Sequence, residues 1–437
     1  MDAPLFVITI KLGTKKCGFA FQFRCDFKHD PTSVISYIFK TGSTLTFEFP
    51  TSLFLARNGD VSFGYEAQQI FTDSRGEGVF FGNFGEDLYL SEDFDERTVI
   101  TDSTGNEHNA LDMFAKYINA ICKFIVNYLI NKSKQTLRPS DMRWVLTVPS
   151  VRADRSVNFF QKGWMTAKIT NEVVTVVTYP NAALNYCLYL PPEQCNNVPL
   201  HQFKKGQRLM VVGFEEELDS FNVYEKIDDQ RFKQVVHFLS GSSTRQLILK
   251  ALDSFFEDLI GSWIWKTSKI LDEDLWQGIC EKADFLIERK VESDTKITFS
   301  SKFSMVENIC SEHTNVSLKR IIQSSEYGGQ VTFLGDKIRV DSKLIKPLFE
   351  RGIGKAIHNI GQVLERSDDK EVNTMIFVGN IAKSGLFQHA VKTKYPEKQI
   401  ITPDGAIDAA VKGAVLFGHK PIVVSSIFCG AQCLVPR

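Results

Sequence analysis

Residues 109–131 carry the clearest hydrophobic pattern in the chain, because their apolar side chains recur at spacings of three and four. The stripe consists of Leu111, Phe114, Ile118, Ile121, Ile125 and Leu129. This spacing places the apolar side chains on one face of an α-helix. Weaker patterns of the same kind predict helices over residues 154–167, 181–189, 244–265, 342–366, 384–394 and 406–417.

Short runs of apolar and β-branched residues alternate with these helices. They cover residues 6–10, 18–23, 44–49, 144–148, 173–177, 208–214, 221–226, 374–378 and 399–402. Such runs, bounded by Gly, Pro and Asn, predict strands. Their alternation with helices predicts the α/β fold class.

Each half of the chain begins with a predicted β-hairpin, at residues 6–23 and 208–226. This repetition predicts two similar lobes around a central cleft, with the hairpin turns facing the cleft. Backbone amides at such turns can bind phosphate groups. We expect the more polar stretch 271–325 to form the outer part of the second lobe.

Composition narrows the choice of partners. The 437 residues are 43% hydrophobic and 24% charged, with a formal net charge of −1, as in an ordinary globular protein. A charge so near zero argues against a nucleic-acid partner, and we expect a protein partner that the sequence does not identify. The chain shows no run of 18 apolar residues and no signal-peptide pattern, so neither a membrane span nor secretion is expected.

The cysteines indicate a reducing compartment. There are nine of them, an odd number, and none forms a CxxC pair. Free thiols are therefore favoured over a disulfide framework, and we expect a cytoplasmic protein. Cys429 and Cys433 have no His nearby, so we interpret them as packing residues. HExxH, GxSxG and GxxxxGK[ST] motifs are missing from the sequence, and we assign neither a metal ligand nor a catalytic residue.

Several segments, in the right order, resemble signature motifs of the actin/heat-shock/sugar-kinase ATPase superfamily. They are residues 7–20 (VITIKLGTKKCGFA), 144–149 (WVLTVP), 179–183 (YPNAA) and 377–384 (FVGNIAKS). The ending KGAVLFG at 412–418 closely resembles that of the heat shock 70 kDa protein 12 group, and PTSL at 50–53 and FGYEA at 63–67 fit this group too. The resemblance runs from Phe6 to Pro421.

The resemblance implies a two-lobed actin-like ATPase fold of duplicated ribonuclease-H-like domains. Lobe I would cover residues 1–188, with an outer subdomain at about 41–107. Lobe II would cover residues 189–437, with an outer subdomain at about 246–329. The positions equivalent to the family's ATP site are Gly13, Thr14, Lys15, Gly241, Ser242, Gly379, Asn380 and Ser384.

Residues that handle ATP and Mg²⁺ in the family are replaced in this chain. The first-loop carboxylate is Lys11, the Glu before the helix proline is Tyr179, and the acidic position of the second loop is Gly213. The three glycines of that second loop are Glu215–Glu217. Mg²⁺ needs oxygen ligands, and at an effective dielectric of about 20 one charge repulsion at about 4 Å costs on the order of 4 kcal/mol. We therefore expect no cofactor, with Mg²⁺-ATP bound only if the loops remain competent.

The charged loops also have simpler interpretations. We interpret Lys11, Lys15 and Lys16 as solvated turn charges in preference to an anion site. We interpret Glu215–Glu217 as a solvent-exposed acidic turn in preference to a site for a cation or a basic partner. We expect residues 240–244 (SGSST) to supply a helix N-cap, and residues 288–290, near the family's adenine-contacting charges, to lie on a solvated helix face.

Three hypotheses for function follow. The first is a pseudo-ATPase, a binding or scaffold protein that keeps the fold without turnover. The alternative is a divergent ATP-binding, chaperone-like ATPase in which Lys11 and Lys15 bind phosphate in place of metal. A kinase for a small hydroxyl substrate, with Asp219 as its carboxylate, ranks last.

Overall fold

Two large mixed sheets organise the fold of the computed structural model, which describes residues 4–41, 44–74, 77–91, 94–151, 153–288, 295–367 and 372–426. The first sheet has the order β13-β12-β1-β2-β3, with β6 also paired to β2. Its strands are β1 (Phe6–Leu12), β2 (Lys16–Phe23), β3 (Ile35–Ser36), β6 (Phe49–Pro50), β12 (Met142–Val148) and β13 (Thr175–Thr178).

The second sheet has the order β21-β20-β14-β15-β16-β22. Its strands are β14 (Arg208–Phe214), β15 (Asp219–Lys226), β16 (Arg231–Leu239), β20 (Val372–Gly379), β21 (Gln399–Ile401) and β22 (Val423–Ser426). In both sheets the central strand, β1 or β14, is antiparallel to its hairpin partner and parallel to a strand reached later in the chain. The two predicted hairpins are thus confirmed, and five strands follow the same order in both sheets, β13-β12-β1-β2-β3 and β21-β20-β14-β15-β16.

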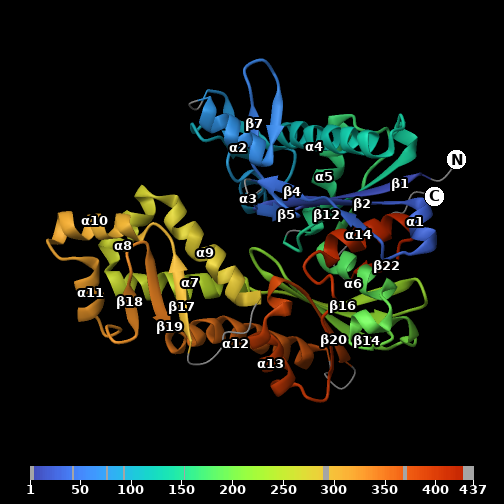
Figure 1. Ribbon diagram of the computed structural model, residues 1–437. Coiled ribbons are helices and arrows are strands. Elements are labelled where there is room, and N and C mark those ends of the chain that lie inside the picture. The colour runs from blue at the N-terminus through green and yellow to red at the C-terminus, as the bar shows by residue number, and fades with distance from the viewer. Residues whose placement is uncertain are drawn as a thin grey trace.

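Helices cover the two large sheets, lie between them, or pack beside the smaller sheets (Figure 1). They are α1 (Arg24–His29), α2 (Gly64–Asp73), α3 (Phe84–Leu90), α4 (Ala110–Ser133), α5 (Ala153–Ala167), α6 (Tyr179–Tyr189), α7 (Thr244–Ile260), α8 (Ser262–Leu271), α9 (Glu273–Glu288), α10 (Phe303–Thr314), α11 (Leu318–Ser324), α12 (Ser342–Arg366), α13 (Gly385–Lys394) and α14 (Ala409–His419). The helices α4 and α5 pack on one face of the first sheet, and α7 and α12 on one face of the second.

The helices α6 and α14 lie between the two sheets. Ala182 and Val415 pack with Val7 and Val145 of the first sheet, whereas neighbouring residues of the same helices pack with the second sheet. The two helices touch so closely that a Cβ on Gly413 would lie 1.7 Å from the carbonyl oxygen of Ala182. This contact requires glycine, and it ties the two sheets together through their shared helices.

Smaller sheets accompany the two large ones. They consist of β4 (Phe39–Thr41) with β5 (Thr44–Thr46), β7 (Leu53–Leu55) with β8 (Val61–Phe63) and β9 (Val79–Phe81), β10 (Val99–Thr101) with β11 (Glu107–Asn109), and β17 (Lys296–Ser300) with β18 (Val331–Phe333) and β19 (Lys337–Asp341). The predicted single helix over residues 244–265 is wrong. Gly261 adopts a φ of 103°, which ends α7 before α8 begins.

The helix α4 is long and apolar enough, by length and composition alone, to cross a membrane. Half of its most apolar stretch is buried inside the structure, and Phe114, Ile118, Ile121 and Ile125 pack in the core beneath the first sheet. A core helix of a globular protein passes the same test, so no membrane span is required.

Candidate functional site

The loops predicted to handle phosphate follow strands of the two large sheets. Because β1 and β12 run parallel, as do β14 and β20, the segments after these strands lie at the carboxyl ends of the sheets. The segments are the turn at residues 13–15, Ser150, the turn at residues 215–218 and Gly379. The fold therefore brings most of the predicted site residues to one region.

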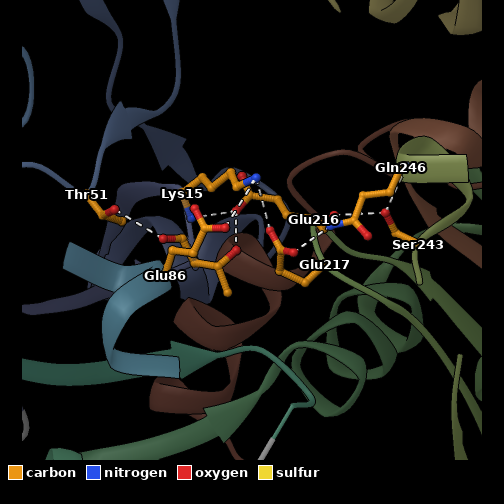
Figure 2. A network of polar contacts seen from close by, with 8 residues as sticks. Lys15, Thr51, Glu86, Glu216, Glu217, Ser243 and Gln246 are labelled. Atoms are coloured by element: carbon orange, nitrogen blue, oxygen red, sulfur yellow. Dashed lines mark hydrogen bonds and ion pairs between the residues drawn. The ribbon is translucent and has the colours of Figure 1, made fainter. Parts of the chain in front are cut away.

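The side chain of Glu216 extends from the turn after β14 to the turn between β1 and β2. Its Oε2 atom accepts hydrogen bonds from the Oγ1 of Thr14 and from the backbone nitrogen of Lys15, both at 2.9 Å (Figure 2). A Cβ on Gly13 would lie 2.2 Å from the carbonyl oxygen of Lys16, so the tight turn needs glycine. The donors that a bound oxyanion would use here are already taken by a carboxylate of the same chain.

Glu215 makes a similar contact with the loop after β12. The backbone nitrogen of Ser150 donates to its Oε2 at 3.0 Å, and the Ser150 hydroxyl donates to its Oε1 at 2.7 Å. Burial raises the pKa of Glu215 above its usual range, although the bonds from Ser150 oppose this shift. A second carboxylate of the turn is thus held by the first sheet.

Glu217 completes the network with Lys15. The Lys15 ammonium lies 3.4 Å from Glu217 and 3.7 Å from Glu86, and Gln246 donates a hydrogen bond to Glu217 (Figure 2). Only 18% of the Glu217 side chain is exposed. The prediction of a solvent-exposed acidic turn is therefore wrong, because each carboxylate points toward donors within the protein.

Lys11 is not a solvated turn charge either. Its side chain is 18% exposed and forms an ion pair with Glu48. Burial alone would lower the pKa of Lys11, but the nearby carboxylates of Glu48 and Glu216 outweigh it and raise that pKa above its usual range. The Lys11 ammonium also lies 5.5 Å from the centre of the Tyr179 ring, a cation–π distance.

The loop at residues 240–243 forms hydrogen bonds with the backbone of the acidic turn at residues 215–217. Ser243 caps α7 by accepting a hydrogen bond from the Gln246 nitrogen, which confirms the predicted N-cap. The Ser243 hydroxyl donates a hydrogen bond to the backbone carbonyl oxygen of Glu216. The backbone nitrogen of Ser243 donates to the backbone carbonyl oxygen of Glu217. Of the predicted site residues here, Gly241 is exposed and the Ser242 carbonyl accepts from Ser240.

The predicted adenosine loop begins directly beside the acidic turn. Gly379 pairs with Phe214 and has a φ of 92°, and a Cβ at this position would lie 2.3 Å from the Phe214 carbonyl oxygen. Asn380 follows as the exposed first residue of the short helix η5 (Asn380–Lys383), and Ser384 is buried after it. Glu288 is exposed at the end of α9, as predicted, whereas residues 289–290 and both C-terminal cysteines, 429 and 433, lie outside the described residues.

Asp219 and Tyr179 are buried in the same region. Asp219 is 2% exposed, and its Oδ2 accepts hydrogen bonds from the nitrogen and hydroxyl of Thr244. Burial raises the pKa of Asp219 from 3.8 to about 7. Burial also raises the pKa of Tyr179 well above 10, so this phenol stays neutral at physiological pH. Within the described ranges, no three His, Cys, Asp or Glu side chains are placed to hold a metal ion.

Several partners of this network were not predicted from the sequence. Ser150 could have been found, because it follows the strand predicted at residues 144–148, which pairs in parallel with β1 in the structure and therefore ends at the same edge. Glu48, Glu86 and Gln246 carry no local signal, since they come from separate elements that meet only in the folded protein.

This mixed α/β architecture, with phosphate-type loops at the ends of parallel strands, is compatible with an actin-like ATPase fold. No protein-family model matches the chain. Heat shock 70 kDa protein 12A from Mus musculus is 21% identical over alignments covering 96% of this chain and 70% of that protein. Heat shock 70 kDa protein 12B from Homo sapiens is 22% identical over 96% of this chain and 69% of its own length.

The human 12A protein is 20% identical over the same 96% of this chain. The chain is thus related along almost its whole length to the heat shock 70 kDa protein 12 group, as its motifs predicted. These relatives support a heat-shock-70-like nucleotide-binding domain.

Proposed function

We propose that this chain is a heat-shock-70-like domain that does not hydrolyse ATP and acts as a binding or scaffold protein. The observation that carries this proposal is the position of Glu216. Its carboxylate accepts the Thr14 hydroxyl and the Lys15 amide, which are the donors of the first phosphate loop. A triphosphate in that loop would have to displace one negative charge and then lie beside Glu215 and Glu217.

The residues present do not fit Mg²⁺-ATP. Mg²⁺ is held by oxygen ligands, but the first loop presents the ammonium of Lys11, which is already paired with Glu48. Tyr179, at the position of a family carboxylate, is a neutral phenol. Phosphoryl transfer depends on charge stabilisation and positioning, so a loop without these groups lacks the means for it.

The alternative, a divergent ATPase, needs Lys11 and Lys15 to meet phosphate. In the structure Lys11 is paired with Glu48, and Lys15 lies between Glu86 and Glu217. Both lysines would have to leave carboxylates before binding an anion. The pairing therefore favours the pseudo-ATPase.

We also propose that the two large sheets are the cores of duplicated ribonuclease-H-like lobes. Their shared arrangement, an antiparallel hairpin followed by parallel strands on the other side of the central strand, supports this view. In such a fold the acidic turn would lie where two lobes face each other.

Thermal denaturation of the purified chain with and without Mg²⁺-ATP tests the proposal. A ligand present at 100 times its dissociation constant stabilises a protein by about 2.7 kcal/mol. We expect millimolar Mg²⁺-ATP to leave the melting temperature unchanged and phosphate release to stay at the level of a protein-free control. A rise of several degrees, or release above that level, would contradict the proposal.

A further inference from the structure

The acidic turn connects parts of the chain that belong to different sheets. Glu215–Glu217 follow β14 of the second sheet, whereas their partners Thr14, Lys15 and Ser150 lie in loops of the first sheet. Glu215 and Glu216 make hydrogen bonds to these loops, and Glu217 pairs with the Lys15 ammonium. All three carboxylates therefore contact loops of the first sheet. The turn therefore bridges the sheets as a group.

We propose that this turn is a clasp, defined by Glu215–Glu217 with Thr14, Lys15 and Ser150, that fixes the two sheets to each other without nucleotide. The inference rests on the proposed function, because the carboxylates that exclude phosphate also supply the link between the loops. The domain would then hold one fixed arrangement whether or not ATP is present. Such a constant shape suits a scaffold.

Glu216 is hydrogen-bonded to a loop of the first sheet through its side chain and to a loop of the second sheet through its backbone. Its carboxylate is held by Thr14 and Lys15 of the first sheet, and its carbonyl oxygen is held by the hydroxyl of Ser243 at 2.8 Å. Ser243 caps α7, whose inner face is buried in the core of the second sheet. The residue is thus anchored at both ends to rigid elements.

The chemistry of these bonds favours a stable link. Hydrogen bonds to a charged carboxylate are stronger than those between neutral groups. The low exposure of Glu217 and the burial of Thr14 reduce competition from water. Lys15 adds a positive charge between Glu217 and Glu86, which offsets repulsion among the carboxylates.

The sheets are also joined through α6 and α14, which pack between them. This second connection does not involve the acidic turn. A chain without the clasp should therefore keep its two cores and its central helices, while the relative position of the sheets becomes variable. The clasp can be removed and tested in a folded protein.

Distance measurements on the full chain test the inference. Spin labels are attached to unnatural amino acids at Gln69 on α2 and Lys319 on α11, which are exposed positions in the outer parts beside different sheets. Pulsed electron paramagnetic resonance then measures the distance between the two labels in wild type and in the triple variant E215A/E216A/E217A. A control, E107A/E172A/E312A, removes three exposed carboxylates elsewhere.

We expect one narrow distance distribution for wild type and the control, unchanged by Mg²⁺-ATP, and a distribution at least twice as broad for the triple variant. An unchanged distribution in a folded triple variant would overturn the clasp. If the triple variant unfolds, Thr14→Val, which removes one donor to Glu216 and keeps the side-chain shape, takes its place with the same criteria. ATP binding to wild type is measured separately, so ATP binding together with broadening contradicts the proposed function and supports the clasp.

Discussion

The Oε2 atom of Glu216 lies 2.9 Å from the backbone nitrogen of Lys15, so a carboxylate from the second sheet takes the amide offered by the turn of the first. In a phosphate-binding loop, such an amide is available to the ligand. This contact, from a chain related to the heat shock 70 kDa protein 12 group, is the observation on which the proposed loss of ATP hydrolysis rests, since function depends on sites rather than folds.

Replacing Glu216 with alanine should lower the free energy of unfolding by about 1–2 kcal/mol, because it leaves the partly buried Thr14 hydroxyl without an acceptor, whereas water can reach the exposed Lys15 amide. Glu216→Gln keeps an acceptor oxygen and should cost less. Urea denaturation measures both. A Glu216→Ala chain as stable as the exposed-site control Glu312→Ala would contradict the assigned contacts.

Replacing Glu48 with glutamine should destabilise the chain by up to about 3 kcal/mol, because Lys11 has little exposure to water and loses its ion-pair partner, keeping only the influence of the Glu216 carboxylate. Adding Lys11→Met to the same chain should recover much of the loss, since the unpaired charge is then gone. A double-mutant cycle by urea denaturation measures the coupling. Additive effects would show that the two side chains do not interact.

Replacing Asp219 with asparagine should change how stability depends on pH. The folded-state pKa of Asp219 is raised from 3.8 to about 7. The protonated side chain therefore adds to the free energy of unfolding in full below pH 3.8, and this contribution is lost as pH rises through about 7. Asp219→Asn does not titrate, and relative to wild type it should gain up to about 4 kcal/mol between pH 4 and pH 8. Parallel stability curves for the two chains would contradict the buried, raised-pKa carboxyl.

Replacing Gly379 with alanine should destabilise the chain by more than about 3 kcal/mol, because the new Cβ combines a left-handed backbone with a clash against the Phe214 carbonyl oxygen. Gly105→Ala is a matched control, with a φ of 90° and open space around the Cβ position. It should cost only about 1–2 kcal/mol. Thermal denaturation compares them, and equal losses would place the cost in backbone strain alone.

The sequence predicted the elements with strong periodicity or a clear turn. The apolar stripe from Leu111 to Leu129 lies on α4, and the two predicted hairpins correspond to β1–β2 and β14–β15. The helix over residues 244–265 was predicted as one element because its apolar spacing continues past Gly261, whose left-handed backbone is visible only in the structure.

The candidate site was located by its loops, but the side-chain environment was not predicted. Lys11 and Glu217 were interpreted as solvated charges from residue type alone, since most Lys and Glu are exposed. Their partners, Glu48 for Lys11 and Lys15 for Glu217, are distant in sequence and approach only when two sheets meet. Pairing of this kind leaves no local pattern in a single sequence.

Equilibrium dialysis of radiolabelled ATP, with and without Mg²⁺, against the wild-type chain tests the central claim most directly. E215G/E216G/E217G, measured beside it, restores glycine at the three positions. The account predicts no retention of ATP by wild type at millimolar concentration and measurable retention by the glycine variant, in which the Thr14 and Lys15 donors are free. Micromolar binding by wild type, or ATP retention that is the same for both chains, would contradict it.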